Sequence, residues 1–248
     1  MKNKISLKNL IVLQHDQNED LEIIEEYLSF HKFLIKKIRL YLNEEIPKNI
    51  DEYDLMISLG GPMDTWMEKK HPWLIKEKEA IRKFVITLEK PFIGICLGCQ
   101  ILGEVLGAKV VKSKKKEIGF LDVSINKDKY FDKNFLDFPN IFKVFQWHSY
   151  EVVSLLNPKI KIIASSKSTK NQVFKYKNHA YGIQFHFELK ENTIENWCKN
   201  KEFKKVINKI FGENSINLIN EKYKDELMTM NRLCKKFLEK FLRENKLI

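Results

Sequence analysis

Short apolar runs alternate with helix-like segments through the first half of the chain, and this alternation restricts the fold more than any other feature. The apolar runs predict strands at Leu10–Gln14, Phe33–Leu40, Asp54–Leu59 and Phe92–Ile95. The segments between them predict helices at Glu19–His31, Pro72–Leu88 and about Leu97–Leu106, the last ending at Gly107. Strands joined through helices pair in parallel, and helices then cover both faces of the sheet. The first half therefore predicts an α/β fold.

The second half has a different pattern, in which short strand-like runs follow one another with few helices between them. These runs are Val110–Val111, Leu121–Ile125, Val144–Trp147, Ile160–Ala164, Val173–Tyr176 and Ala180–Phe185. They predict a mixed or antiparallel extension of the same sheet. From Lys190 onward the pattern is helical. We expect one domain over residues 1–190 and a helical C-terminal segment, residues 191–248, packed on that domain.

The composition argues against several classes of protein. The formal net charge is +11, but nearly all basic residues are scattered lysines, and only four are arginines. Nucleic-acid recognition usually uses the planar arginine fork, so we expect no nucleic-acid partner. No stretch approaches the roughly 18 apolar residues of a membrane span, and residues 1–14 lack a secretory signal. We therefore expect a cytoplasmic protein with no membrane partner, whose four cysteines are reduced thiols.

The segment Phe92–Gln100, FIGICLGCQ, carries the strongest chemical signal. An apolar strand ends, Cys96 lies between Gly94 and Gly98, and a helix begins, which is the cysteine version of a nucleophile elbow. Such a turn is so sharp that side chains at the glycine positions would clash with backbone. The start of a helix also favours a thiolate, the reactive form of cysteine. A buried cysteine beside packing glycines would give the same local pattern.

Two further motifs could complete a site for acyl transfer. A strand ending in His-x-Glu would place His186 and Glu188 on one face, where the carboxylate can fix the imidazole tautomer. The turn Gly60-Gly61-Pro62 can aim a backbone N–H into the cleft, where it would join the N–H of Leu97 as an oxyanion hole. Taken singly, the first motif could be a solvated pair and the second an ordinary glycine turn.

The order of these motifs resembles that of the class I glutamine amidotransferases. Gly-Gly-Pro at 60–62 comes first, Gly-x-Cys-x-Gly-x-Gln at 94–100 second, and His-x-Glu at 186–188 last. The resemblance runs from about Leu10 to Glu188. It is closest to a stand-alone branch that is similar to the amidotransferase domain of GMP synthase and includes γ-glutamyl peptidases. Features of this branch are Gly60–Met63 leading to Pro72-Trp73, then Phe145–His148 and Asn171-Gln172.

This resemblance implies a flavodoxin-like fold with an open, mostly parallel sheet, and an amidotransferase-like catalytic domain at 1–190. It implies that Cys96 attacks a γ-glutamyl amide, that His186 acts as the base and that Glu188 orients it. The resulting γ-glutamyl thioester would be hydrolysed by water. The oxyanion hole would be formed by the N–H groups of Gly61 and Leu97. Substrate contacts would come from Gly60, Gln100, Trp147, His148, Ser149 and Tyr150. No metal and no organic cofactor is implied.

The chain departs from the branch at three places. Ser149-Tyr150 stands where Gly-Asp is usual, Phe187 stands where Pro is usual, and Cys99 occupies a variable position. Loss of the Asp removes an anchor for the ammonium group of the substrate. We expect the added aromatic surface of Tyr150 and Phe187 to border the substrate and to suit a leaving group larger than ammonia.

The sequence also contains features of other functions. Cys96 and Cys99 form a C-x-x-C pair, which a thiol–disulfide oxidoreductase would use. A zinc site from Cys96, Cys99 and His186 lacks an evident fourth ligand. Within the family, the protein could hydrolyse a γ-glutamyl compound by itself, supply ammonia to a separate synthetase as partner, or act as a binding subunit. The chain has no P-loop signature for a synthetase of its own.

Overall fold

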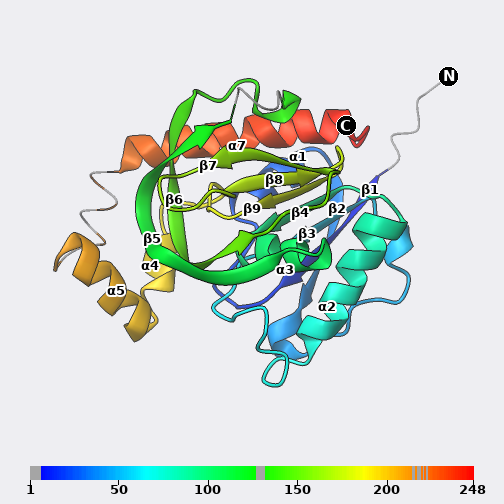
Figure 1. Ribbon diagram of the computed structural model, residues 1–248, viewed down its shortest axis with the longest axis horizontal. Coiled ribbons are helices and arrows are strands. Elements are labelled where there is room, and N and C mark those ends of the chain that lie inside the picture. Colours follow the sequence, from blue (N-terminus) through cyan, green and yellow to red (C-terminus); the bar gives the residue numbers. More distant parts are fainter. Residues whose placement is uncertain (1–6, 127–131, 214–215, 217–218, 220, 222) are drawn as a thin grey trace.

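All strands in the described part of the chain belong to one sheet. The computed structural model describes residues 7–126, 132–213, 216, 219, 221 and 223–248. Within these residues the sheet has nine strands in the order β2-β1-β3-β4-β9-β8-β7-β5-β6 (Figure 1). The parallel strands are β1 (Lys8–Gln14), β2 (Phe33–Arg39), β3 (Leu55–Ser58), β4 (Phe92–Ile95) and β9 (Ala180–Ile183). The antiparallel extension comprises β8 (Val173–Tyr176), β7 (Ile160–Ser165), β5 (Lys109–Ile125) and β6 (Ile141–Val153). The predicted α/β class and mixed sheet are confirmed.

Helices cover both faces of the parallel part of the sheet, as Figure 1 shows. Helices α1 (Ile23–Phe30) and α7 (Lys224–Glu244) share one hydrophobic cluster with Leu10 and Val12 of β1. Helices α2 (Trp73–Arg82) and α3 (Leu97–Val105) share the other cluster with Ile11 and Leu13. Successive side chains of a strand point to opposite faces, so a strand covered on both sides is apolar throughout. This is why β1, β3 and β4 appear in the sequence as continuous apolar runs.

The prediction of separate strands at Val110–Val111 and Leu121–Ile125 is wrong. Both runs belong to β5, whose pairing with β6 shifts register between Lys112 and Glu117. Several of the lysines in this stretch are solvent-exposed, so hydrophobic periodicity is lost although the backbone continues as a strand. The predicted strand Ala180–Phe185 is also too long, because β9 ends at Ile183.

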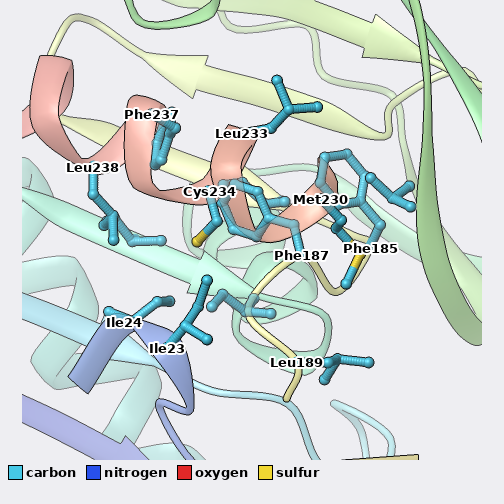
Figure 2. Packing of buried hydrophobic residues seen from close by; sticks show 14 of the residues in the cluster. Ile23, Ile24, Phe185, Phe187, Leu189, Met230, Leu233, Cys234, Phe237 and Leu238 are labelled. Atoms are coloured by element: carbon cyan, nitrogen blue, oxygen red, sulfur yellow. The ribbon is translucent and has the colours of Figure 1, made fainter. Parts of the chain in front are cut away.

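Helices α4 (Thr193–Trp197), α5 (Lys201–Phe211) and α7 follow the sheet, which agrees with the helical pattern beyond Lys190. Helix α7 buries the side chains of Met230, Leu233, Cys234, Phe237 and Leu238. Figure 2 shows these side chains gathered with residues of α1 and with the segment that follows β9. No helix in the described ranges is long and apolar enough to cross a membrane.

Candidate active site

Cys96 occupies the turn between β4 and α3. Its backbone has φ 50° and ψ −101°, a left-handed conformation that is costly for any residue other than glycine. The flanking glycines have no room for side chains: a Cβ on Gly94 would lie 2.4 Å from the Gly98 carbonyl oxygen, and one on Gly98 would lie 2.2 Å from that of Ser58. The N–H of Cys96 donates to Ile183 at 2.8 Å, which ties the turn to β9. The sharp turn expected from the sequence is therefore present.

His186 and Glu188 meet just beyond β9. The strand expected to carry both residues stops at Ile183, and the N–H of His186 donates instead to the carbonyl of Phe145 in β6 at 2.8 Å. Nδ1 of His186 lies 2.6 Å from Oε1 of Glu188, while Oε2 accepts a hydrogen bond from the N–H of Phe187 at 2.8 Å. The pair thus forms in an irregular segment rather than within a strand.

The surroundings of His186 favour its protonated form. Burial alone would lower the pKa of this imidazole, but the charge of Glu188 and hydrogen bonds with Cys96 and Glu188 outweigh it and raise the pKa well above the ordinary value. Trp197 of α4 packs edge-on against the imidazole, with ring centroids 5.1 Å apart. An imidazole that readily holds a proton beside a thiol is suited to accept the thiol proton.

A cavity of about 200 Å³ opens over the elbow. Its wall includes Cys96, His186, Gly61 and Leu97. Among the described residues, no group accepts a hydrogen bond from the N–H of Gly61 or of Leu97. Two such donors beside a nucleophile are the requirement for an oxyanion hole.

Most of the residues expected to contact substrate line this cavity. They are Gln100, Trp147, His148, Ser149 and Tyr150. The segment 147–150 lies within β6. Gly60 does not line the cavity; it is buried beneath Glu19 and His186, and its carbonyl faces His15.

Hydrogen bonds fix the polar side of the cavity. The Gln100 amide donates to the carbonyl of Tyr150 at 3.3 Å and to Oε1 of Gln184 at 3.2 Å, and the Gln184 amide lies 3.8 Å from Cys96 Sγ. His148 donates through Nδ1 to the carbonyl of Tyr150 at 2.9 Å. The bond between Gln100 and Tyr150 joins α3 to β6.

The expectation that Phe187 borders the substrate is wrong. Its side chain is buried under α7, with its ring centroid 5.7 Å from that of Phe237 (Figure 2). The backbone turns between His186 and Glu188, so the residue between them points into the core. Phe187 therefore contributes to packing and not to the cavity.

Four residues of the cavity wall, Glu19, Asp64, Trp197 and Phe203, were missed in the sequence. Trp197 and Phe203 come from α4 and α5 and stand beside Trp147, with centroid distances of 5.8 Å and 5.1 Å. Nothing in the local sequence places these helices over the site. Glu19 also lines the cavity, and its position just after β1 was a signal, because parallel strands end at one edge of the sheet. Burial raises the pKa of Glu19 to about 7.

The alternative sites have little support in the geometry. The Cys99 side chain is fully buried on α3, and burial raises its pKa well above the ordinary value, which makes its thiol a poor partner for disulfide exchange. Across the described ranges, no three His, Cys, Asp or Glu side chains are placed to hold a metal ion.

Around one cavity lie a cysteine on a strand-to-helix turn, a histidine paired with a glutamate, and two residues whose N–H groups have no acceptor in the described ranges. Such a set of groups is suited to acyl transfer. The profile of the family described as "Glutamine amidotransferase class-I" matches residues 22–206. The chain belongs to the class I glutamine amidotransferase family.

Several relatives and one solved structure show how the chain compares within the family. It is 29% identical over 183 residues to the glutamine amidotransferase-like protein YfeJ of Salmonella typhimurium, covering 72% of this chain and 76% of the relative. It is 34% identical to a glutamine-hydrolysing GMP synthase subunit from Sulfurisphaera tokodaii (66% and 84% covered) and 25% identical to gamma-glutamyl peptidase 3 of Arabidopsis thaliana (77% and 76%). The crystal structure of a glutamine amidotransferase from Thermotoga maritima superposes with a TM-score of 0.84 at 29% identity, covering 96% of this chain and 99% of that one.

Proposed function

We propose that this protein hydrolyses γ-glutamyl amides through a thioester on Cys96. The observation that carries the proposal is the convergence, around one cavity, of Cys96, the His186–Glu188 pair and two N–H groups that have no acceptor within the described part of the chain. The family membership supports hydrolysis of glutamine or a γ-glutamyl compound. The particular substrate follows from the shape and chemistry of the cavity.

Each residue of the site has one role in the proposed reaction. His186 takes the proton of Cys96, and the thiolate attacks the γ-carbonyl carbon, whose oxygen becomes negative beside the N–H groups of Gly61 and Leu97. His186 then protonates the nitrogen, the C–N bond breaks, and ammonia or an amine leaves. Water loses a proton to His186 and attacks the thioester, the C–S bond breaks, and glutamate leaves while the proton returns to Cys96. Glu188 stabilises the imidazolium formed in each half.

The aromatic side chains beside His186 favour a substrate whose leaving group is larger than ammonia. Trp147, Trp197 and Phe203 line one side of the cavity, next to the imidazole that would protonate the departing nitrogen. Aromatic side chains gain free energy by covering apolar surface, which ammonia lacks and the amine of a γ-glutamyl peptide can offer. We therefore propose a γ-glutamyl peptide or amide as the preferred substrate.

The second candidate function is production of ammonia for a separate synthetase. The similarity to the glutamine-hydrolysing GMP synthase subunit favours it. In that case glutamine would be the preferred substrate, and turnover would rise when the partner binds.

The two functions are separated by kinetics on the isolated protein. Ammonia and glutamate release is measured with glutamine and with γ-glutamyl dipeptides whose second residue is alanine or phenylalanine. We expect kcat/KM to be highest for the phenylalanine compound, and Phe203→Ala to lower only that advantage. A clear preference for glutamine would favour the ammonia-supplying role, and inertness toward every compound would refute hydrolysis by the isolated chain.

A further inference from the structure

A buried histidine–glutamate pair lies against the Gly60–Gly61 turn, and neither of its side chains lines the cavity. Nδ1 of His15 lies 3.0 Å from the carbonyl oxygen of Gly60. Its Nε2 lies 2.9 Å and 3.0 Å from the two carboxyl oxygens of Glu77, and the Ser58 hydroxyl donates to Glu77 at 2.8 Å. The side chains of His15 and Glu77 are both 0% exposed. None of these three side chains takes part in the proposed reaction.

The hydrogen-bonding partners determine where the protons lie. A carbonyl oxygen can only accept, so Nδ1 of His15 carries a proton and donates it to Gly60. Nε2 lies within hydrogen-bond distance of both carboxyl oxygens of Glu77, and this contact keeps the imidazole in place. Burial by itself would lower the pKa of His15, but the charge of Glu77 and the hydrogen bonds to Glu77 and Gly60 raise it above the ordinary value. The ring of Trp73 stacks on the imidazole of His15, with ring centroids 5.4 Å apart.

The hydrogen bond from His15 to the Gly60 carbonyl also sets the direction of the Gly61 N–H. In a trans peptide the C=O and the following N–H point to opposite sides, and no peptide in the described chain is cis. Holding the Gly60 carbonyl toward His15 therefore turns the N–H of Gly61 away from the core, toward the cavity that Gly61 lines. A peptide between two glycines rotates more freely than any other, so its direction needs an outside restraint.

We infer that the His15–Glu77 pair is a positioning device for the oxyanion hole: by holding the Gly60 carbonyl, it keeps the Gly61 N–H directed at the reacting carbonyl of the substrate. The inference rests on the proposed function. A buried pair of this kind is a weak source of stability, because its desolvation cost is high. Its effect should therefore be found mainly in kcat, since an oxyanion donor acts in the transition state.

Two double variants isolate the contact with Gly60. Both carry Glu77→Gln, so neither leaves a buried charge; one adds His15→Asn and the other His15→Leu. The Asn side-chain amide can place a donor near the position of Nδ1, whereas Leu cannot. We expect H15N/E77Q to keep a kcat at least about 10-fold above that of H15L/E77Q, with KM values within about two-fold. Ser58→Ala, a milder change, should lower kcat by about two- to five-fold without altering KM.

Two further readouts separate positioning from general stability. Inhibition by the γ-aldehyde of glutamate, which forms a tetrahedral adduct with Cys96, should weaken in parallel with kcat, whereas alkylation of Cys96 by iodoacetamide should keep its rate. Asp132→Asn is the matched control, because it removes a buried ion pair to Lys175 (2.6 Å) that does not touch the cavity. It should lower the melting temperature and leave kcat unchanged.

The outcomes are distinguishable. Equal kcat in the two double variants and an unaffected Ser58→Ala would overturn the positioning role, as would losses of kcat that follow the melting temperature across all variants, D132N included. If the wild-type protein is inert toward all γ-glutamyl substrates and does not bind the aldehyde, the proposed function itself fails, and the inference fails with it.

Discussion

At the scale of single residues, the site combines backbone strain with unusual titration. Cys96 has a positive φ, and the turn around it leaves no room for side chains at Gly94 and Gly98. Glu19, an acidic residue beside His186, has its pKa raised to about 7, because burial of the carboxylate outweighs the opposing effect of the His186 charge. Both features lower the stability of the fold, and both residues lie in the cavity wall. Backbone strain and shifted pKa values are typically found at functional sites.

Glu19→Gln should change how stability depends on pH. The folded protein keeps the Glu19 proton up to about pH 7, whereas the unfolded chain loses it near pH 4.5, so wild-type stability falls as the pH rises between these values. The variant should lack this fall and be more stable at pH 8 by about 2 kcal/mol, after allowance for the solvent that reaches the cavity. Urea unfolding at pH 5 and pH 8 measures it. Glu45→Gln, at an 86% exposed carboxylate, is the control; equal pH dependence of E19Q and wild type would exclude the raised pKa.

Gly61→Val should lower kcat by about 10²-fold, the usual effect of losing one oxyanion donor. A Cβ at Gly61 would lie 2.7 Å from the Met63 sulfur, 2.8 Å from His15 Cβ and 3.0 Å from Leu97 Cδ2, so the turn must twist and redirect its N–H. Steady-state kinetics and a melting curve check this expectation. A variant that melts normally and turns over at the wild-type rate would show that the turn is only structural.

At the scale of secondary-structure elements, the parallel strands were predictable and the later segments less so. Strands β1, β3 and β4 are buried on both faces, which leaves uninterrupted apolar runs, and the elbow glycines are required by steric contact. In contrast, β5 includes a run of exposed lysines, and the part of β6 at the cavity carries polar residues. Neither strand therefore shows the regular alternation of apolar and polar residues that predicts a strand. Helices α4 and α5 lie beside the site because they contact β6, for example through Phe203 and Trp147. Such contacts cannot be predicted from the spacing of residues in the sequence.

Phe237→Ala tests the packing of α7 as an element. The Phe237 ring is fully buried and contacts the rings of Phe135, Tyr181 and Phe187. Truncating it should lower the free energy of unfolding by about 3–5 kcal/mol, because a cavity remains. Met228→Ala on the same helix is the control, since that side chain is 62% exposed and its loss should cost less than about 0.5 kcal/mol. Similar losses in both variants would mean that α7 is not held by this face.

At the scale of the whole molecule, the two helical layers share one sheet, and the C-terminal helices belong to its core. Phe237 and Phe241 of α7 are in the same cluster as Leu10 and Val12 of β1, although they are more than 200 residues apart in the chain. Trp197 also donates from α4 to the carbonyl of Asn18 at 2.9 Å. The segment 191–248 is therefore expected to unfold together with residues 1–190.

A single unfolding transition should follow. Far-UV circular dichroism and tryptophan fluorescence should give the same urea midpoint, since the helices and the sheet lose their shared core together. A fragment of residues 1–190 should be markedly less stable than the full chain. Two separated transitions, or a fragment with the full-length midpoint, would identify the C-terminal segment as an independent unit.

The most direct test of the central claim is to map the residue that reacts with an electrophilic glutamine analogue, one carrying a diazoketone in place of the amide. We predict one label per chain, on Cys96, appearing at the rate at which hydrolysis is lost, and no label and no turnover in Cys96→Ala. Label on Cys99, Cys198 or Cys234, or turnover that survives Cys96→Ala, would contradict Cys96 as the nucleophile.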